Sequence, residues 1–430
     1  MTIGEIFANI FSTFRTTITP QVLDYIILAS PVVLALILLK MFTHLWMEYV
    51  RSQFFLAQKY AVLEVRLPKD LYKSPVAMEL FLNSLHGSSD GNWFEQIWLG
   101  KTRAFASLEI VSIEGQVKFF IWLRESAKVN TQTTLYAIFP GIEVYEREDY
   151  SRATSYEPEN MKVWATELKF TKKDATNSYP IKTYVDYGLD KDPKEEFKVD
   201  PLVPLLEFLG SVGPNQQVWI QIIIQGHGKD SRKAGHLWKK TDLWKDEAQE
   251  EVNKILMRDN KSKVSGEQVF DEDGKATGFT KSPTISKGEQ EVVAALERSI
   301  SKLAFDVGIR AVYIAQKDFF NPANIAGIVG NFKHFNSEHL NGFKPGGPWM
   351  GNIEYPWQDY KDTRRKKMSR NVIMAYKRRS YFHSPFKGKS MVMNTEELAT
   401  VFHFPGAVAS TPTLGRIPSK KSEAPANLPI

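Results

Sequence analysis

A charge-free apolar run near the amino end is the strongest constraint on how this chain folds. The run extends from Tyr25 to Leu39, between Asp24 and Lys40. As a helix it would rise only about 22 Å, less than the ~30 Å hydrocarbon core of a bilayer. If the Lys40 side chain snorkels, the helix continues to Trp46, about 32 Å from Tyr25. The run therefore predicts a transmembrane helix with an aromatic side chain at each interface.

We expect anchor and stalk to cover residues 22–58. The expected anchor side chains are Tyr25, Ile26, Ile27, Leu28, Val32, Val33, Leu34, Leu36, Ile37, Leu38, Leu39 and Trp46. Pro31 kinks a transmembrane helix without excluding it. A signal peptide would require a cationic start and a cleavage site of small residues, which this segment does not offer. A buried core helix is the remaining alternative.

The segments flanking the anchor predict its orientation. Residues 1–20 carry apolar side chains at helical spacing, as in an amphipathic helix lying in the membrane interface, although a partner-binding helix would have the same pattern. Only Arg15 precedes the anchor, whereas Lys40, Arg51 and Lys59 follow it. The positive-inside rule then predicts a single-pass protein of the cytoplasmic (inner) membrane, with its carboxyl-terminal body in the cytoplasm.

Composition limits the chemistry of the body. The chain has 430 residues and no cysteine, which excludes disulfides, zinc–thiolate sites and thiol catalysis. The net charge of +6 is small for this length. It becomes informative only near the carboxyl end, where the positive charges concentrate.

The pattern of strands and helices predicts an α+β body. Residues 60–150 read as β-α-β-β-α-β, the order of a ferredoxin-like domain. The expected elements are strands 60–67, 105–113, 117–123 and 142–146 and helices 74–85 and 126–139.

Residues 160–335 predict a second α+β domain with a mobile insertion at 258–288. Its expected strands are 163–170, 181–187, 218–225 and 309–315, and its expected helices are 201–209, 243–257, 289–305 and 323–332. Within residues 336–406 we expect an ordered loop rich in Gly, Pro and Trp at 336–360. A basic helix at 362–381 and a short helix at 395–402 follow. Residues 407–430 have the composition of an extended linker or arm.

Motifs of common catalytic sites give no positive signal. His-Glu-x-x-His and the dinucleotide fingerprint do not occur. Gly388-Lys389-Ser390 resembles the end of a P-loop, but His383 stands where the first glycine is required. The run 146–149, Glu-Arg-Glu-Asp, is interpreted as a solvated strand end rather than a catalytic carboxylate pair.

Histidines do not form a convincing metal site. His227 and His236 lie near Asp230, and His334 lies near His339, but no carboxylate cluster at ligand spacing accompanies either pair. We expect these to be loop histidines. The sequence thus predicts no catalytic residue, no metal and no cofactor.

The basic helix is the strongest local signal for binding. Its cationic side chains are Arg364, Arg365, Lys366, Lys367, Arg370, Lys377, Arg378 and Arg379. Such a density of charge binds phosphates of nucleic acid or of anionic lipid in a salt-dependent manner. A solvated face, or a surface for an acidic partner, would have the same composition.

Several segments resemble the amino-terminal module of membrane-anchored DNA-translocating ATPases. These are the TraG/HerA-like proteins of conjugation or type IV secretion from uncultured bacterial lineages. The similar segments are Ser107–Gly115, Tyr136–Val144, Glu148–Tyr150, Asn394–Gly406, Thr411–Leu414 and Pro425–Pro429. In that family the last segment leads into the ATPase domain. This chain ends at Ile430 without one, so the resemblance implies a motor on a separate chain or a stand-alone descendant.

We therefore expect a non-enzymatic membrane protein that anchors or orients a DNA-translocating or secretion-type ATPase. Expected partners are membrane lipid, a separate P-loop ATPase subunit, DNA and further copies of the chain. The alternative is a membrane-bound scaffold of an envelope assembly without a role in nucleic-acid binding.

Overall fold

The computed structural model describes residues 20–68, 73–87, 89, 91–172, 178–190, 199–228, 231–232, 240–256, 268–270, 276–279, 285–349, 353, 355–406 and 416. The chain divides into two compact units. The first consists of Met1–Gln58 and Asp90–Thr102, and the second of Lys59–Ser89 and Arg103–Ile430. The predicted amphipathic helix and nearly all of the predicted arm lie outside the described residues.

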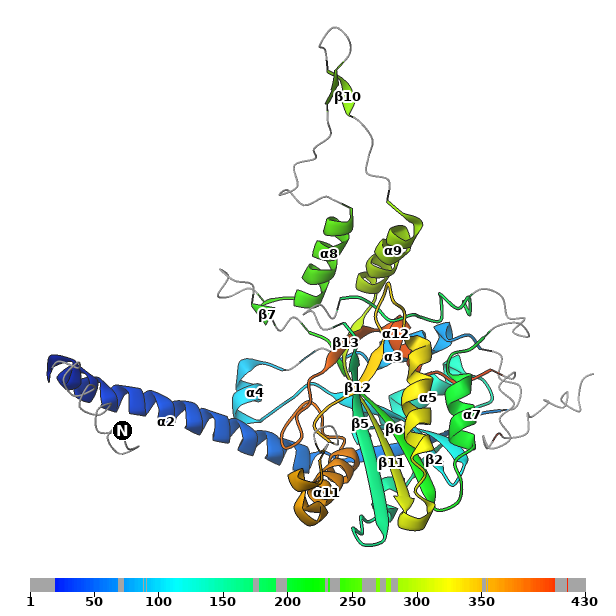
Figure 1. The fold of residues 1–430 in the computed structure, drawn as a ribbon, viewed down its shortest axis with the longest axis horizontal. Helices are drawn as coiled ribbons and strands as arrows, with labels where there is room; N and C mark the ends of the chain where they lie inside the picture. The colour runs from blue at the N-terminus through cyan, green and yellow to red at the C-terminus, as the bar shows by residue number, and fades with distance from the viewer. Residues whose placement is uncertain are drawn as a thin grey trace, which may run out of the picture. The chain divides into compact units, whose positions relative to one another are not determined.

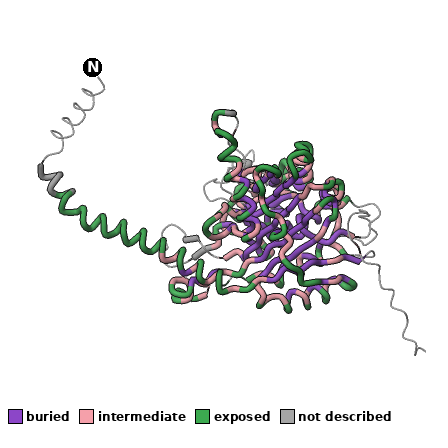
Figure 2. Tube along the Cα trace, turned by 90° about the horizontal axis from the view of Figure 1, so that it is seen from below, coloured by how far each residue is buried: buried purple, intermediate pink, exposed green. Residues whose placement is uncertain are grey.

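The first unit contains a long apolar helix, α2 (Pro20–Ala57), and a short one, α4 (Trp93–Trp98). Within α2 the segment Ile27–Ala57 is long and apolar enough to cross a membrane. Its most apolar stretch buries nothing against the protein, and Figure 2 shows this part of the helix exposed. Pro31 lies inside this helix without interrupting it. A membrane-spanning helix at the predicted place is thus supported by length and composition.

The second unit is built on a nine-stranded antiparallel sheet. Eight strands follow the order β12-β5-β11-β6-β2-β3-β1-β4, and β13 pairs with β11. The strands are β1 (Tyr60–Arg66), β2 (Phe105–Ile113), β3 (Gln116–Arg124), β4 (Glu143–Arg147), β5 (Met161–Phe170), β6 (Gln216–Gly226), β11 (Ala304–Gln316), β12 (Phe343–Gly346) and β13 (Met391–Asn394).

The sheet contains the same arrangement twice. The first half runs β1-α3-β2-β3-α5-β4 and has the strand order β2-β3-β1-β4. The second runs β5-α7-β6-β11-α10-β12 and has the corresponding order β6-β11-β5-β12. The two halves join edge to edge where β2 pairs with β6. The helices concerned are α3 (Val76–Leu85), α5 (Lys128–Ile138), α7 (Val203–Gly210) and α10 (Ala323–Asn331).

An insertion separates β6 from β11. Its helices α8 (Leu243–Ile255) and α9 (Lys287–Ser301) pack against each other through small and apolar side chains such as Ala248, Val252 and Leu296. Short strand pairs, β7 (Ser231–Arg232) with β8 (Lys240–Thr241) and β9 (Gln268–Phe270) with β10 (Ala276–Phe279), belong to the same segment. Much of the predicted insertion at 258–288 lies outside the described residues.

The two faces of the sheet are covered differently. Because side chains alternate along a strand, one face of each strand packs under α3, α5, α7, α10 and α12 (Thr395–Val401), forming the larger core. The opposite face lies under α11 (Thr363–Lys377), which Figure 1 shows on the far side of the sheet from α5 and α7. Buried residues follow the strands in Figure 2. The shorter helices are η1 (Glu125–Ala127), α6 (Tyr150–Ala153), η3 (Lys317–Phe319), η4 (Phe332–Phe335), η5 (Pro356–Gln358) and η6 (Tyr360–Asp362).

The structure corrects four of the predicted elements. The basic helix expected at 362–381 ends at Lys377. Residues 181–183 are irregular and 184–187 form turns, because the backbone N–H groups of Ile181 and Tyr184 bond to side chains of α12 instead of a neighbouring strand. The predicted helix 289–305 ends at Ser301, and Ala304 already belongs to β11. The expected loop 336–360 contains β12, which pairs with β5.

Candidate functional site

A row of mostly polar residues crosses the face of the sheet that α11 covers. Successive register partners place one residue of each strand in this row, and such partners share a face. From β4 to β12 the row reads Tyr145, Glu64, Phe120, Glu109, Gln221, Arg310, Glu167 and Gly346. The row thus crosses both halves of the sheet, which we call the two repeats. Its centre lies where β2 pairs with β6.

Arg379 binds Glu109, in the first half of this row. Its guanidinium contacts both carboxylate oxygens of Glu109 at 3.0 and 3.1 Å and also pairs with Asp149. Arg379 and Glu109 are fully buried. Burial alone would lower the pKa of Arg379, but the Glu109 carboxylate raises it well above the ordinary value. The hydroxyl of Tyr150 donates a further hydrogen bond to Glu109 at 2.7 Å.

Arg310 binds the second half of the row. Its guanidinium donates to the side chains of Gln221 and Glu167 and to the backbone carbonyl of Ser380, each at 3.2 Å. The indole N–H of Trp349 also donates to Glu167, at 2.8 Å. Gln221 bridges the halves, because its amide N–H group donates to Glu109 at 3.2 Å. The network therefore fixes α11 and the chain after it across the junction of the repeats.

The helix α11 presents an exposed cationic face. Asp359 caps its start, accepting the backbone N–H groups of Arg364 and Arg365 at 2.7 and 3.0 Å. Among the predicted binding residues, the exposed ones are Arg364, Arg365, Lys367, Arg370 and Arg378, whereas Lys366 and Lys377 are half-buried. Lys366 pairs with Glu159 at 2.8 Å, and Arg365 pairs with Asp362 at 3.5 Å. Arg379 lies in the interior, and that position is a correction to its predicted role in surface binding.

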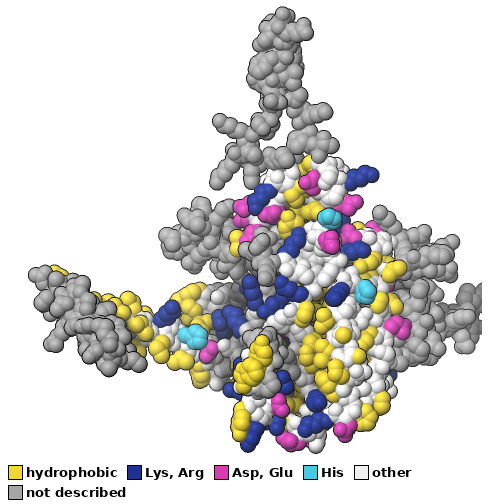
Figure 3. All heavy atoms as spheres, viewed as in Figure 1, with side chains coloured by type: hydrophobic (Ala, Val, Ile, Leu, Met, Phe, Trp, Pro, Cys, Tyr) yellow, Lys and Arg dark blue, Asp and Glu magenta, His cyan; other side chains and the backbone are white. Residues whose placement is uncertain are grey.

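Aromatic side chains border this cationic face. Trp357 and Tyr360 are 77% and 74% exposed, and Tyr355 stacks on Trp357 with ring centroids 4.7 Å apart. Lys361 lies over the Tyr360 ring. Figure 3 shows hydrophobic and cationic side chains side by side in this region. We call Tyr355, Trp357, Tyr360 and the exposed cations of α11 the basic–aromatic surface.

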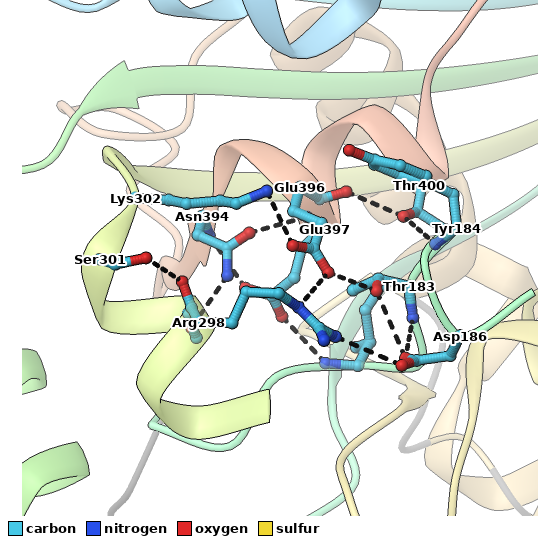
Figure 4. A network of polar contacts seen from close by, with 12 residues as sticks. Thr183, Tyr184, Asp186, Arg298, Ser301, Lys302, Asn394, Glu396, Glu397 and Thr400 are labelled. Carbon is cyan, nitrogen blue, oxygen red and sulfur yellow. Dashed lines mark hydrogen bonds and ion pairs between the residues drawn. The ribbon is translucent and has the colours of Figure 1, made fainter. Parts of the chain in front are cut away.

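A second buried network holds α12, which lies within the segment Asn394–Gly406 (Figure 4). Glu396 accepts hydrogen bonds from Arg298 at 3.0 Å and from Thr183, and it pairs with Lys302 at 2.8 Å. Arg298 also binds Asp186 at 3.2 Å. Glu396 is about 1% exposed. The acidic pair in the Asn-Thr-Glu-Glu segment therefore fastens α12 to the body.

Glu397 has a different partner set. Together with Asn394 it forms a capping box at the start of α12, and it also accepts the backbone N–H of Ile181 at 2.9 Å. Burial raises the pKa of its carboxyl group to about 8. After the helix, His403 binds Asp200 at 2.9 Å. Burial opposes a charged imidazole, but Asp200 raises the pKa of His403.

The candidate ligand His227 lies between two carboxylates. Its ring lies 2.8 Å from Asp306 and 3.3 Å from Asp242. Burial would lower its pKa, but Asp306 raises it. His236 and Asp230 lie outside the described residues, and no group of three or more metal-ligating side chains occurs within the ranges described.

Two other features bear on chemistry. An open groove of about 670 Å³ is lined in part by Glu159, the residue that pairs with Lys366. Its lining carries three acidic side chains and one basic side chain. Residues 87–91, Gly-Ser-Ser-Asp-Gly, have the spacing of a nucleophile elbow, and this match was not among the predicted features. That motif requires a strand before the serine and a helix after it, whereas here the residues follow α3.

The buried charges were also missed at the level of sequence. Glu109 and Arg310 each interrupt an apolar strand at a position whose register neighbours are buried. A charged residue in the centre of such a strand signals a buried ionic partner, although not which one. The partner of Glu109, Arg379, is 270 residues away in sequence.

A model of a domain of unknown function, DUF8128, matches residues 49–416. The chain belongs to this family. The DUF8128 match begins inside α2, after the charge-free run, and includes the repeats, α11 and α12. It thereby contains both buried networks and the basic–aromatic surface. None of the curated proteins matches the chain.

Proposed function

We propose that this DUF8128 protein is a non-enzymatic single-pass membrane protein that holds a partner at the cytoplasmic face of the inner membrane. The observation that carries the proposal is α2. Its most apolar stretch is wholly exposed, and exposing such a surface to water is unfavourable. The excess of Lys40, Arg51 and Lys59 after the apolar run favours a cytoplasmic body.

The proposed partner is a separate DNA-translocating or secretion-type P-loop ATPase. Support comes from the resemblance of Asn394–Gly406 and the other matching segments to the anchoring module of such motors. The basic–aromatic surface supplies a place for an acidic partner or for DNA. The buried charges of both networks bind other parts of the same chain, which suits a rigid docking body.

We also propose that both repeats are ferredoxin-like. The support is the shared β-α-β-β-α-β order and the matching antiparallel strand order in each half. In this view, α8 and α9 are an insertion into the second repeat. This assignment describes architecture, since ferredoxin-like domains serve many functions.

Membrane extraction tests the anchor. We expect the full chain to stay with membranes under alkaline carbonate. A variant with Leu34→Asp and Leu38→Asp should be released, because each carboxylate near the centre of a transmembrane helix costs roughly 2.5–3.5 kcal/mol. Ser52→Asp, beyond the apolar run, is the control. Release of the unmodified chain would contradict the proposal.

Purification tests the partner. The full chain reconstituted in lipid nanodiscs should retain a P-loop ATPase from the same organism, and neighbouring reading frames should encode one. Retention of envelope proteins without any ATPase, together with absence of DNA binding, would favour the alternative of an envelope scaffold.

A further inference from the structure

The short helix α4 in the first unit is well formed although it exposes its apolar side chains. Asn92 and Glu95 form a complete capping box, with bonds of 2.8 and 3.0 Å. Lys101 binds Glu95 at 3.1 Å. These polar contacts stabilise the helix from its ends, so its six residues do not depend on burial of their side chains.

The exposed residues of α4 are unusually apolar. Trp93 is 70% exposed, Phe94 56%, Trp98 52% and the following Leu99 56%. Figure 3 shows hydrophobic side chains gathered over α4 and along α2. Isolated exposed apolar residues are common, but a cluster of this kind marks a surface that binds something.

The helix α4 is fixed to one short part of α2, around Trp46 and Val50. The indole N–H of Trp46 donates to the carbonyl of Ile97 at 2.9 Å, and the rings of Trp46 and Trp98 meet edge to face at 5.6 Å. Gly100, with a φ of +65°, lies so close to α2 that a Cβ would be 2.4 Å from the carbonyl oxygen of Val50. Only glycine permits this approach, so the position of α4 along α2 is set by the backbone.

The position of Trp46 along α2 coincides with the expected membrane surface. From Ile27 to Trp46 the helix rises about 28 Å, close to the ~30 Å of the hydrocarbon core. Trp46 and the α4 aromatics therefore lie where α2 would leave the hydrocarbon. Aromatic rings with a polar group are favoured in this layer, and Glu95 and Lys101 supply the charged edge that headgroups and water solvate.

We propose that α4 is a second membrane contact, which inserts Trp93, Phe94 and Trp98 into the headgroup layer of the bilayer that α2 crosses. The inference rests on the proposed membrane anchor. The occupant of this surface is lipid rather than protein, because its rings join those of the proposed anchor: Trp98 contacts Phe94 and Trp46, and Trp46 stacks on Phe42 of α2. The contact fixes the depth of α2, since vertical movement would pull the aromatic side chains out of the interface.

Single-cysteine labelling can test the contact, because the chain has no native cysteine. Trp93→Cys and Phe94→Cys carry the test label, Leu36→Cys reports the hydrocarbon core and Asp318→Cys reports water. Each full-length variant is reconstituted in phosphatidylethanolamine–phosphatidylglycerol vesicles and labelled with a nitroxide. Collision rates with oxygen and with a water-soluble nickel complex then give the depth of each label.

We expect labels at 93 and 94 to lie between the Leu36 and Asp318 labels in depth. Labels at 93 and 94 as accessible to nickel as the Asp318 label would overturn the α4 contact while leaving the anchor intact. Labels shielded from both reagents would also overturn it, because they would indicate a protein partner. An aqueous Leu36 label would instead show that the anchor itself fails. Circular dichroism of each variant verifies that the fold is retained.

Discussion

At the scale of single residues, Arg379 illustrates why charges lie inside this protein. Removing a guanidinium and two carboxylates from water is costly, and close ion pairing offsets that cost only if every partner remains. The pairing with Glu109 and Asp149 therefore stabilises the position of the chain after α11, rather than the fold in general. Removing one partner should be far more harmful than removing an exposed charge.

We expect Arg379→Ala to lower the free energy of unfolding by about 3–5 kcal/mol, because the buried Glu109 and the half-buried Asp149 would remain without their cation. The neighbouring Arg378→Ala is the matched control and should change stability by less than about 0.5 kcal/mol. Thermal unfolding of the full chain in detergent measures both. Adding Glu109→Gln to Arg379→Ala should restore part of the stability. Equal effects of the two arginine substitutions would contradict the buried-pair assignment.

Glu397 predicts a pH dependence of opposite sign to that of most carboxylates. Its pKa is about 8 in the folded protein and near 4.5 when exposed, so the folded state binds the proton more tightly. Its contribution to stability is therefore complete below pH 4.5 and declines as the pH rises toward 8. Glu397→Gln keeps a carbonyl oxygen for the cap and should remove this decline. Unfolding of the wild type and the variant at several pH values checks this, with exposed Glu338→Gln as the control. Parallel pH profiles for wild type and Glu397→Gln would refute it.

At the scale of secondary structure, the sequence predicts an element best where its local pattern favours the same structure as its backbone hydrogen-bond partners do. Alternation and turn residues predict the strand at 105–113 with its observed bounds. They also predict a helix at 126–139, which is observed at 128–138. Both predictions succeed because these signals are local. Residues 181–187 have strand-like alternation, yet their backbone partners are Glu397 and Thr400. These partners lie more than 200 residues away in sequence, so no local pattern contains that information.

The basic–aromatic surface is likewise predicted only where the local sequence determines it. Its cationic residues are evident from the sequence, but which of them face solvent depends on how α11 packs. Arg379 is buried although it adjoins exposed Arg378. The sequence predicts the aromatic border only as a loop, because the local pattern does not indicate exposure.

Charge reversal on α11 tests this surface. Lys367→Glu should weaken binding of duplex DNA by the reconstituted chain. It should also reduce the slope of log K against log salt concentration by about 0.9, because one fewer phosphate would be neutralised. Lys333→Glu, exposed on η4, makes the same change in net charge and should have little effect. If both variants weaken binding equally, binding reflects net charge rather than α11. If the unmodified chain does not bind DNA, the surface serves lipid or protein.

At the scale of the whole second unit, the pairing of β2 with β6 makes one sheet out of two repeats. Leu108 and Ile222 face each other at this junction, and both are fully buried. The row from Glu64 to Glu167 continues across it, and Arg310, Arg379 and α11 bind both sides. A unit connected through its sheet, its polar row and a covering helix is expected to unfold cooperatively, unlike two domains joined by a linker.

Hydrogen exchange can measure this coupling. Ile222→Ala should cost about 2–5 kcal/mol through the cavity it leaves in β6. If the repeats unfold together, exchange of the most protected amides should accelerate by the same factor in β1 of the first repeat and in β5 of the second. Phe319→Ala, at a 43% exposed position in η3, is the control and should change neither strand. Acceleration confined to β5 would mean that the repeats unfold independently. The pairing of β2 with β6 would then align the two repeats without coupling their unfolding.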